Sequence, residues 1–159
     1  MSFSPNSFPA NFVVPVSAQT ALFVLRPLTI HHVIKDYDAV ITSREYLWQR
    51  FGDAWAWPAD DLSLEQDLID LAWHQKEFQN MSSFAYSVLN LDESRALGCV
   101  YIYPPKTQHV EAEVWFWART SELASGLEHD LEAFLCKWLA ENWPFKVVML
   151  NNQFKTIKA

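Results

Sequence analysis

The stretch Val110–Arg119, VEAEVWFWAR, decides the fold. Successive residues of a β-strand point to opposite faces of a sheet, so this stretch has two distinct sides. One side is small and apolar and consists of Ala112, Val114, Phe116 and Ala118. The other side mixes charge with large aromatic rings and consists of Glu111, Glu113, Trp115, Trp117 and Arg119. Because neither side is fully polar, we expect a strand inside a sheet that carries helices on both faces.

The residues before this strand predict a hairpin and two helices. Ser83–Leu91 and Ala96–Tyr103 are rich in strand-forming residues and flank a polar turn, which predicts an antiparallel hairpin. Asp36–Phe51 and Ser63–Gln79 carry apolar residues at helical spacing. The apolar run within Thr20–Leu28 predicts the first strand.

Boundary signals sharpen the helix predictions. Gly52 is a plausible stop for the first helix. Ser63 is expected to cap the second, with Gln66 completing a capping box. The residues expected to form the buried stripe of the second helix are Leu64, Leu68, Leu71 and Phe78.

The residues after Arg119 predict one more helix and one more strand. Glu122–Trp143 has the strongest helical periodicity, with Gly126 at its entrance, and Lys146–Leu150 is a short apolar strand. The predicted order is strand, helix, helix, three strands, helix, strand. It indicates a mixed α/β domain with a mostly antiparallel sheet and helices on both faces. We assign residues 1–19 to an extended N-terminal segment, with Phe8, Phe12, Val13 and Val14 as candidate anchors, 20–150 to a single domain and 151–159 to a frayed polar tail.

Composition excludes several classes of function. The chain has 159 residues, with 12 basic and 19 acidic side chains and a formal net charge of -7. No lysine or arginine run provides the positive patch that nucleic acid requires, and no apolar run approaches the about 20 residues that span a bilayer. Cys99 and Cys136 are too few and too far apart for a disulfide framework or a zinc site, and we predict no metal site. We expect a cytoplasmic protein, because the N-terminus lacks the pattern of a signal peptide.

Three stretches resemble strands of the GNAT N-acetyltransferases. They are FVLRPLT at 23–29, ALGCVYI at 96–102 and EAEVWFWA at 111–118, and the predicted order of elements resembles that fold over residues 20–150. The resemblance implies direct transfer of an acetyl group from acetyl-CoA to an amine, which is a small molecule or a peptide.

The resemblance also implies where acetyl-CoA binds. Main-chain N–H groups of Phe116, Trp117 and Ala118 would contact the acetyl thioester. The family grips the pyrophosphate with the motif Q/R-x-x-G-x-G/A before a helix, and the aligned stretch here is Ser121–Gly126, SELASG, which keeps only the last glycine. The implied pyrophosphate residues are Ala124, Ser125, Gly126 and Leu127. Glu122 and Glu128 oppose an anionic ligand, and Arg119 is expected to offset part of their charge. The alternative for Gly126 is an ordinary helix-entry glycine.

Glu113 and Glu111 are the candidate catalytic bases, with Glu113 the better match to the family's strand. The alternative is a carboxylate in an ion pair at a strand edge. The resemblance also implies a tyrosine acid after the last strand, yet no tyrosine follows Tyr103, so that acid is missing or replaced. The tryptophans at the implied acceptor pocket are Trp48, Trp55, Trp57 and Trp73, which either bind a cationic amine or fill a core.

A second hypothesis is a non-catalytic GNAT-like module that binds a ligand or a protein. The incomplete phosphate motif and the missing tyrosine favour it. In that case Trp115 and Trp117 would form an exposed partner surface, which a homodimer could use.

Overall fold

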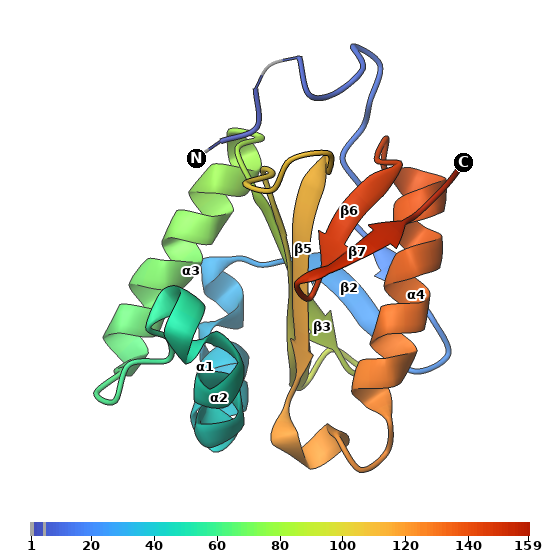
Figure 1. Ribbon diagram of the computed structural model, residues 1–159. Helices are drawn as coiled ribbons and strands as arrows, with labels where there is room; N and C mark the ends of the chain where they lie inside the picture. The colour runs from blue at the N-terminus through green and yellow to red at the C-terminus, as the bar shows by residue number, and fades with distance from the viewer. Residues whose placement is uncertain (1, 5) are drawn as a thin grey trace.

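A seven-stranded sheet stands between two layers of helices in the computed structural model, which describes residues 2–4 and 6–159 (Figure 1). The strands are β1 (Ala18–Gln19), β2 (Val24–Pro27), β3 (Phe84–Leu89), β4 (Ala96–Tyr103), β5 (Ala112–Ala118), β6 (Val147–Leu150) and β7 (Gln153–Thr156). The α-helices are α1 (Val33–Thr42), α2 (Arg44–Trp55), α3 (Leu64–Gln79) and α4 (Leu127–Asn142). Short 3-10 helices cover Ile30–His32 and Thr120–Glu122.

The strands lie side by side in sequence order, and every pair is antiparallel except β5 with β6. The predicted hairpin is confirmed as β3 and β4, and β5 pairs with β4 in the register Val100 to Phe116. Gly98 on β4 lies so close to β5 that an added Cβ would be 2.0 Å from the carbonyl oxygen of Trp117. Only glycine fits there without moving the backbone.

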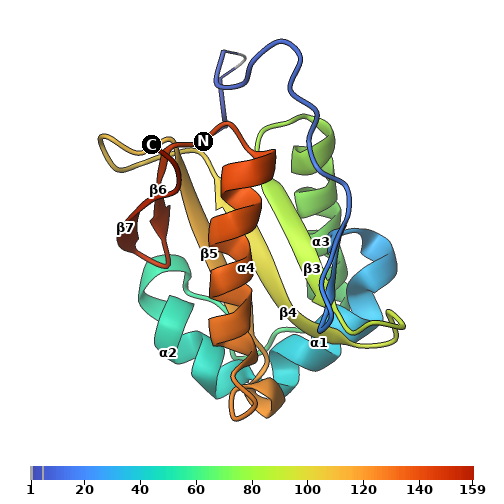
Figure 2. The ribbon, with the colours of Figure 1, turned by 90° about the vertical axis from the view of Figure 1, so that its right-hand side faces the viewer.

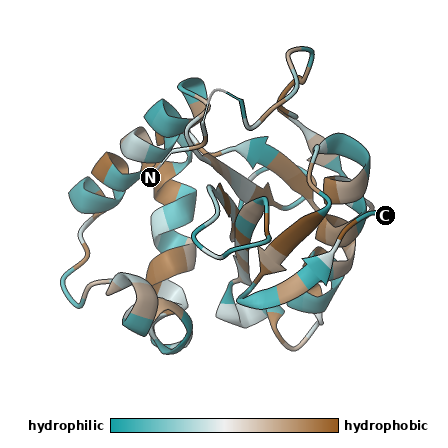
Figure 3. Ribbon diagram, turned by 45° about the horizontal axis from the view of Figure 1, so that its top comes forward, coloured by the Kyte–Doolittle hydropathy of each residue, from teal (hydrophilic) through white to brown (hydrophobic). Residues whose placement is uncertain are grey.

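Each face of the sheet has its own apolar core. Val114 and Phe116 pack with Leu131 and Leu135 of α4, whereas Trp117 packs on the opposite side with Leu47 and other residues of α1–α3. Figures 1 and 2 show α4 alone on one side and the other three helices on the other, and Figure 3 shows apolar residues gathered in the central strands. The prediction of helices on both faces is confirmed.

The N-terminal segment packs against the end of the sheet through phenylalanine rings. Phe3 is only 7% exposed and stacks near Phe145, and Phe12 lies 5.4 Å from the ring of Trp143. β1 then pairs with β2. The prediction that Val13 anchors this segment is wrong, because Val13 is 82% exposed.

The predicted helix Asp36–Phe51 is two helices. It breaks at Ser43, whose hydroxyl oxygen accepts a hydrogen bond of 2.9 Å from the N–H of Thr120, a contact that sequence periodicity cannot reveal. The prediction that Gly52 stops this region is wrong, because α2 continues to Trp55 and ends at Ala56 in the left-handed region, with φ of 50°.

The α3 helix begins where predicted but buries a different face. Ser63 Oγ accepts the N–H of Gln66 at 3.1 Å, which confirms the N-cap. The predicted apolar stripe is wrong at Leu64 and Leu68, which are about 40% exposed, and is confirmed at Leu71, which is buried. The buried face instead carries Asp67 together with Leu71.

The C-terminal residues are not frayed, contrary to the prediction. Asn151 and Asn152 have φ of 45° and 66° and form a tight turn, so β7 returns antiparallel to β6. Such a turn closes a two-residue hairpin because its twist matches that of the strands. None of the helices in the described part of the chain is both long and apolar enough to cross a membrane.

Candidate active site

The free edge of β5 is the first feature of the site. β5 and β6 pair only from Ala112–Val148 to Val114–Leu150, after which β6 turns away into β7. The N–H of Arg119 donates to β4 at Leu97. Since N–H groups alternate in direction along a strand, those of Phe116 and Ala118 point toward the open side. This leaves a cleft of about 340 Å³ beside Phe116, Glu128 and Asn151, which we call the edge cleft.

Side chains of the protein itself occupy this edge. Phe116 donates its N–H to Asn151 Oδ1 at 3.0 Å, and Asn151 Nδ2 donates to the Phe116 carbonyl at 3.3 Å. Ala118 donates its N–H to Glu128 Oε2 at 3.0 Å. The Asn151 amide therefore bonds to β5 as the peptide group of a neighbouring strand would.

An ion pair and a tyrosine fix Glu128 across the cleft. Arg50 Nη1 lies 2.9 Å from Glu128 Oε1, and Arg50 Nη2 donates to the Phe116 carbonyl at 3.0 Å. The Tyr46 hydroxyl is 2.7 Å from both Glu128 oxygens. Burial raises the pKa of Tyr46, and the hydrogen bond to Glu128 raises it further, so the phenol stays protonated and donates. These contacts tie α4 to α2.

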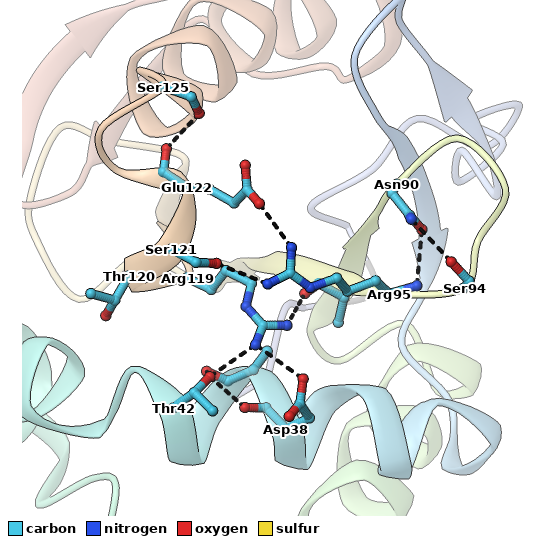
Figure 4. A network of polar contacts seen from close by, with 12 residues as sticks. Asp38, Thr42, Asn90, Ser94, Arg95, Arg119, Thr120, Ser121, Glu122 and Ser125 are labelled. Carbon is cyan, nitrogen blue, oxygen red and sulfur yellow. Dashed lines mark hydrogen bonds and ion pairs between the residues drawn. The ribbon is translucent and has the colours of Figure 1, made fainter.

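The loop between β5 and α4 turns its charged side chains away from the helix entrance. Arg119 is 3% exposed and its guanidinium donates to Asp38 at 3.0 Å, Thr42 at 2.9 Å and the Ala96 carbonyl at 3.0 Å (Figure 4). Glu122 pairs with Arg95 at 3.0 Å. Arg119 therefore holds α1 against the sheet and is not free to offset acidic charge at α4.

An aromatic cavity of about 470 Å³, here called the inner cavity, lies on the other side of β5 between the sheet and α3. Its aromatic walls are Trp55, Trp57, Trp73, Tyr101 and Tyr103. Its acidic residues are Asp36, Asp67 and Asp70, and no lysine or arginine among the described residues lines it.

Two of these carboxyl groups, Asp36 and Asp67, lie together out of solvent. They are 5% and 2% exposed, respectively. Burial and the neighbouring Asp67 charge raise the pKa of Asp36 well above its usual range, so Asp36 is protonated and donates a hydrogen bond to Asp67. Burial is also the largest cause that raises the pKa of Asp67, to about 6. Asp67 Oδ2 is buried without a hydrogen-bond partner among the described residues.

His74 forms part of the same wall. Its ring stacks on Tyr101 with 5.6 Å between centroids, and its Nδ1 is buried without a partner in the described structure. Burial lowers the pKa of His74, so the ring is neutral near pH 7.

A second cavity of about 570 Å³, the outer cavity, shares four wall residues with the inner one: Trp55, Trp73, His74 and Tyr103. Glu113 and Trp115 of β5 and Asn152 of the β6–β7 turn also line it. It therefore reaches the residues next to Phe116 and Asn151, which line the edge cleft. The edge cleft and the outer cavity share no wall residue, but adjacent residues line them, Phe116 and Trp115 on β5 and Asn151 and Asn152 in the β6–β7 turn.

The two predicted bases lie in different surroundings. Glu113 Oε1 accepts the N–H groups of Lys106 at 2.8 Å and Thr107 at 3.0 Å, while the residue faces the outer cavity. Glu111 accepts N–H groups of Lys146 and Val147, where it fastens the start of β6 to β5. Glu111 lines none of the three spaces described above.

Among the predicted tryptophans, Trp55, Trp57 and Trp73 line the inner cavity, whereas Trp48 is half exposed and packs over Gly52. The expectation that Trp117 forms an exposed partner surface is wrong. Trp117 is completely buried, and its indole N–H donates to the Tyr101 hydroxyl at 3.1 Å.

Comparison with solved structures gives close matches of fold. A ribosomal-protein-S5-alanine acetyltransferase from Vibrio fischeri aligns over 86% of this chain and 73% of its own, with a TM-score of 0.65 and 12% identity. RimL, a ribosomal L7/L12 alpha-N-protein acetyltransferase, aligns over 94% and 76%, with a TM-score of 0.64 and 16% identity. A RimL structure in complex with coenzyme A aligns over 86% and 72%, with a TM-score of 0.65.

The chain has the GNAT acetyltransferase fold. No sequence-family model matches it, and no curated protein is similar to it in sequence. The likeness to GNAT structures is therefore one of architecture, and the site must be judged on its own residues.

The backbone at residues 124–127 has a geometry that suits the pyrophosphate of coenzyme A, whereas the charge of the nearby side chains does not. Gly126, with φ of 81°, precedes the first turn of α4, where free N–H groups suit phosphate. Ala124 and Ser125 are exposed beside it, whereas Leu127 is buried. Four acidic residues and no lysine or arginine lie between 120 and 136, namely Glu122, Glu128, Asp130 and Glu132.

Sequence reasoning missed the residues that close the edge of this GNAT fold and the acid pair of its inner cavity. Arg50 and Asn151 carry no motif and meet β5 only through the tertiary fold. Asp67 did give a signal. It lies four residues before Leu71 and so shares the buried face of α3, where an unpaired carboxylate is uncommon.

Proposed function

We propose that the protein is an acetyl-CoA-dependent N-acetyltransferase that transfers the acetyl group directly to an amine, as a cytoplasmic enzyme. The observation that carries this proposal is that adjacent residues of β5 line two separate spaces, the edge cleft and the outer cavity. The edge cleft reaches Phe116 and Asn151, and the outer cavity reaches Trp115 and Asn152, the next residues along the chain. A thioester on one side and an amine on the other would meet there.

Acetyl-CoA supplies an acetyl thioester, and the residues of this chain supply position and proton transfer. The N–H of Phe116 would donate to the thioester carbonyl, which stabilises negative charge developing on that oxygen. Glu113 would accept the proton of the incoming amine, directly or through water, because it is the glutamate of β5 that faces the outer cavity. The first turn of α4, residues 124–128, would receive the pyrophosphate.

This proposal requires Asn151 and Glu128 to release the edge of β5. Their side chains hold the N–H groups of Phe116 and Ala118 that the ligand would use. The free-energy cost of this release is moderate. Each hydrogen bond contributes a net of only about 1 kcal/mol, and the ligand would replace it with an equivalent one.

Calorimetric titration with acetyl-CoA and with CoA tests the proposal. The expected dissociation constant is micromolar, which corresponds to about -8 kcal/mol. Asn151→Ala removes the side chain that accepts the N–H of Phe116, so this variant should bind acetyl-CoA several-fold more tightly than the wild type. Absence of binding at millimolar ligand in both proteins would refute the proposed activity.

Glu113→Gln tests the base. A glutamine keeps a carbonyl oxygen for the N–H groups of Lys106 and Thr107, so the loop stays in place, but it does not accept a proton. We expect the single-turnover rate to fall by about 100-fold or more. Glu111→Gln, directly before β5, is the matched control and should leave that rate unchanged. Equal rates for wild type and Glu113→Gln would exclude this role.

The occupied edge of β5 favours a second candidate function, a non-catalytic module that binds an amine in the aromatic cavities. In this case Asn151, Arg50 and Glu128 complete the sheet permanently. Amine binding without any acetyl-CoA binding would support this function.

A further inference from the structure

The inner cavity contains a buried carboxylate, Asp67, that is not fully hydrogen-bonded by the described residues. A buried carboxylate is normally paired or fully hydrogen-bonded, because burial of an unpaired charge is costly. Asp67 is 2% exposed, yet its Oδ2 has no hydrogen-bond partner in the described part of the chain. The carboxyl group of Asp36 donates a hydrogen bond to Asp67. The floor of the cavity therefore presents a free acceptor.

The walls restrict what can use this acceptor. Aromatic faces attract organic cations and contact methylene groups, whereas a hard metal ion needs several oxygen ligands. Trp55, Trp57 and Trp73 supply such faces, and Tyr101 and Tyr103 close the side toward the sheet. His74 adds a second unpaired polar atom, its ring nitrogen Nδ1, and the neutral ring brings no repelling charge. The unpaired carboxylate favours an ammonium group, and the aromatic walls favour an unbranched aliphatic chain attached to it.

The position of the cavity adds a second requirement. The inner cavity shares four wall residues with the outer cavity, where Glu113 faces the space beside β5. A ligand with one cationic end at Asp67 therefore extends past His74 and Tyr103 toward Glu113. A molecule with a single amine satisfies only one of these two acidic ends.

We propose that the acceptor is a compact aliphatic diamine, with one ammonium group bound at Asp67 in the inner cavity and the other amine in the outer cavity beside Glu113. This second amine would lose its proton to Glu113 and its nitrogen would bond to the acetyl carbon, while the C–S bond breaks and coenzyme A leaves as a thiolate that takes a proton from solvent. This inference rests on the proposed function for the identity of the reacting end. The binding of the first ammonium group does not depend on acetyl transfer.

Calorimetry without acetyl-CoA tests the binding. The probes are α,ω-diaminoalkanes with three to six carbons, and n-butylamine is the single-charge control. We expect the best diamine to bind at least tenfold more tightly than n-butylamine. Equal affinities, or no binding of any diamine at millimolar concentration, would overturn the inference.

Variants locate the site. Asp67→Asn keeps the size of the side chain and an acceptor for Asp36, and it should reduce the diamine affinity at least tenfold, to that of n-butylamine. Glu65→Gln removes the same charge from an exposed position on α3 and should change nothing. A diamine affinity equal in wild type and Asp67→Asn would show that the ammonium group binds elsewhere. Thermal melts of both variants confirm that they are folded.

Acetyl transfer separates the two proposals. Diamine binding that depends on Asp67, without acetylation by acetyl-CoA, contradicts the proposed enzyme and leaves the cation site intact. Acetylation of diamine and n-butylamine with the same KM, unchanged in Asp67→Asn, supports the enzyme and overturns the diamine site.

Discussion

The buried acid pair makes a specific prediction about stability and pH. The folded protein holds the pKa of Asp67 at about 6, above its ordinary value of 3.8. A carboxyl group with a raised folded-state pKa stabilises the fold while it is protonated. Its contribution is complete below pH 4 and is lost as the pH rises through about 6. Asp67→Asn removes this loss.

The size of the effect follows from the shift. A difference of about two pH units corresponds to about 3 kcal/mol at most. Rearrangement of the protein around the buried charge lowers this cost, so we expect about 1 to 2 kcal/mol. For a domain of this size, that corresponds to about 3–6 °C in melting temperature.

Calorimetric melting of wild type and Asp67→Asn between pH 4 and 8 measures this effect. At pH 4 the two proteins should melt within about 1 °C of each other, and at pH 7 the variant should melt about 3–6 °C higher. The difference between the two proteins is the relevant quantity, because other carboxyl groups titrate in both. Glu65→Gln, which removes an exposed charge from the same helix, should show no such pH dependence. A variant that is equally or less stable at pH 7 would refute the shared proton of Asp36 and Asp67.

Three further predictions concern packing and the polar network. Gly98→Ala places a Cβ 2.0 Å from the carbonyl oxygen of Trp117, and we expect a loss of about 3 kcal/mol in urea unfolding; a loss below about 1 kcal/mol would mean that β4 and β5 can separate freely. Arg119→Met leaves the Ala96 carbonyl without its donor and breaks the ion pair with Asp38, so unfolding should require about 2–3 kcal/mol less, measured together with Asp38→Asn in a double-mutant cycle. A coupling energy near zero would assign the loss to the contacts with Ala96 and Thr42. Asn151→Ala should destabilise the protein by about 1–2 kcal/mol, because the N–H of Phe116 loses its acceptor. An unchanged melting temperature would contradict that contact.

The raised stability of Asp67→Asn and its expected loss of diamine affinity have the same cause. A carboxylate that is destabilised in the empty cavity is the group that gains most when an ammonium group arrives. Sites that bind ligands commonly retain such unfavourable groups at a cost in stability. Measuring the melting temperature and the diamine affinity of Asp67→Asn therefore tests in two ways whether the Asp67 carboxylate is destabilised in the empty cavity.

The sequence by itself determined the order of the five strands β2–β6 and of the helical regions between them, and the sheet covered on both faces. It did not reveal β1, β7 or the division of the first helical region into α1 and α2. Alternation within Val110–Arg119 and the polar turn between β3 and β4 are local patterns, and local patterns suffice where each residue's environment follows from its neighbours along the chain. The N-cap at Ser63 was predictable for the same reason, since donor and acceptor are three residues apart.

Only the tertiary structure decided which polar groups meet. The break at Ser43 depends on Thr120, 77 residues away, and the covered edge of β5 depends on Asn151, 35 residues beyond Phe116. The face that α3 buries was decided by the cavity it closes, which places Asp67 inward and leaves Leu64 exposed. Periodicity reports the average polarity of a helix face, whereas the pairing of two carboxyl groups from different helices depends on the three-dimensional packing of α1 against α3.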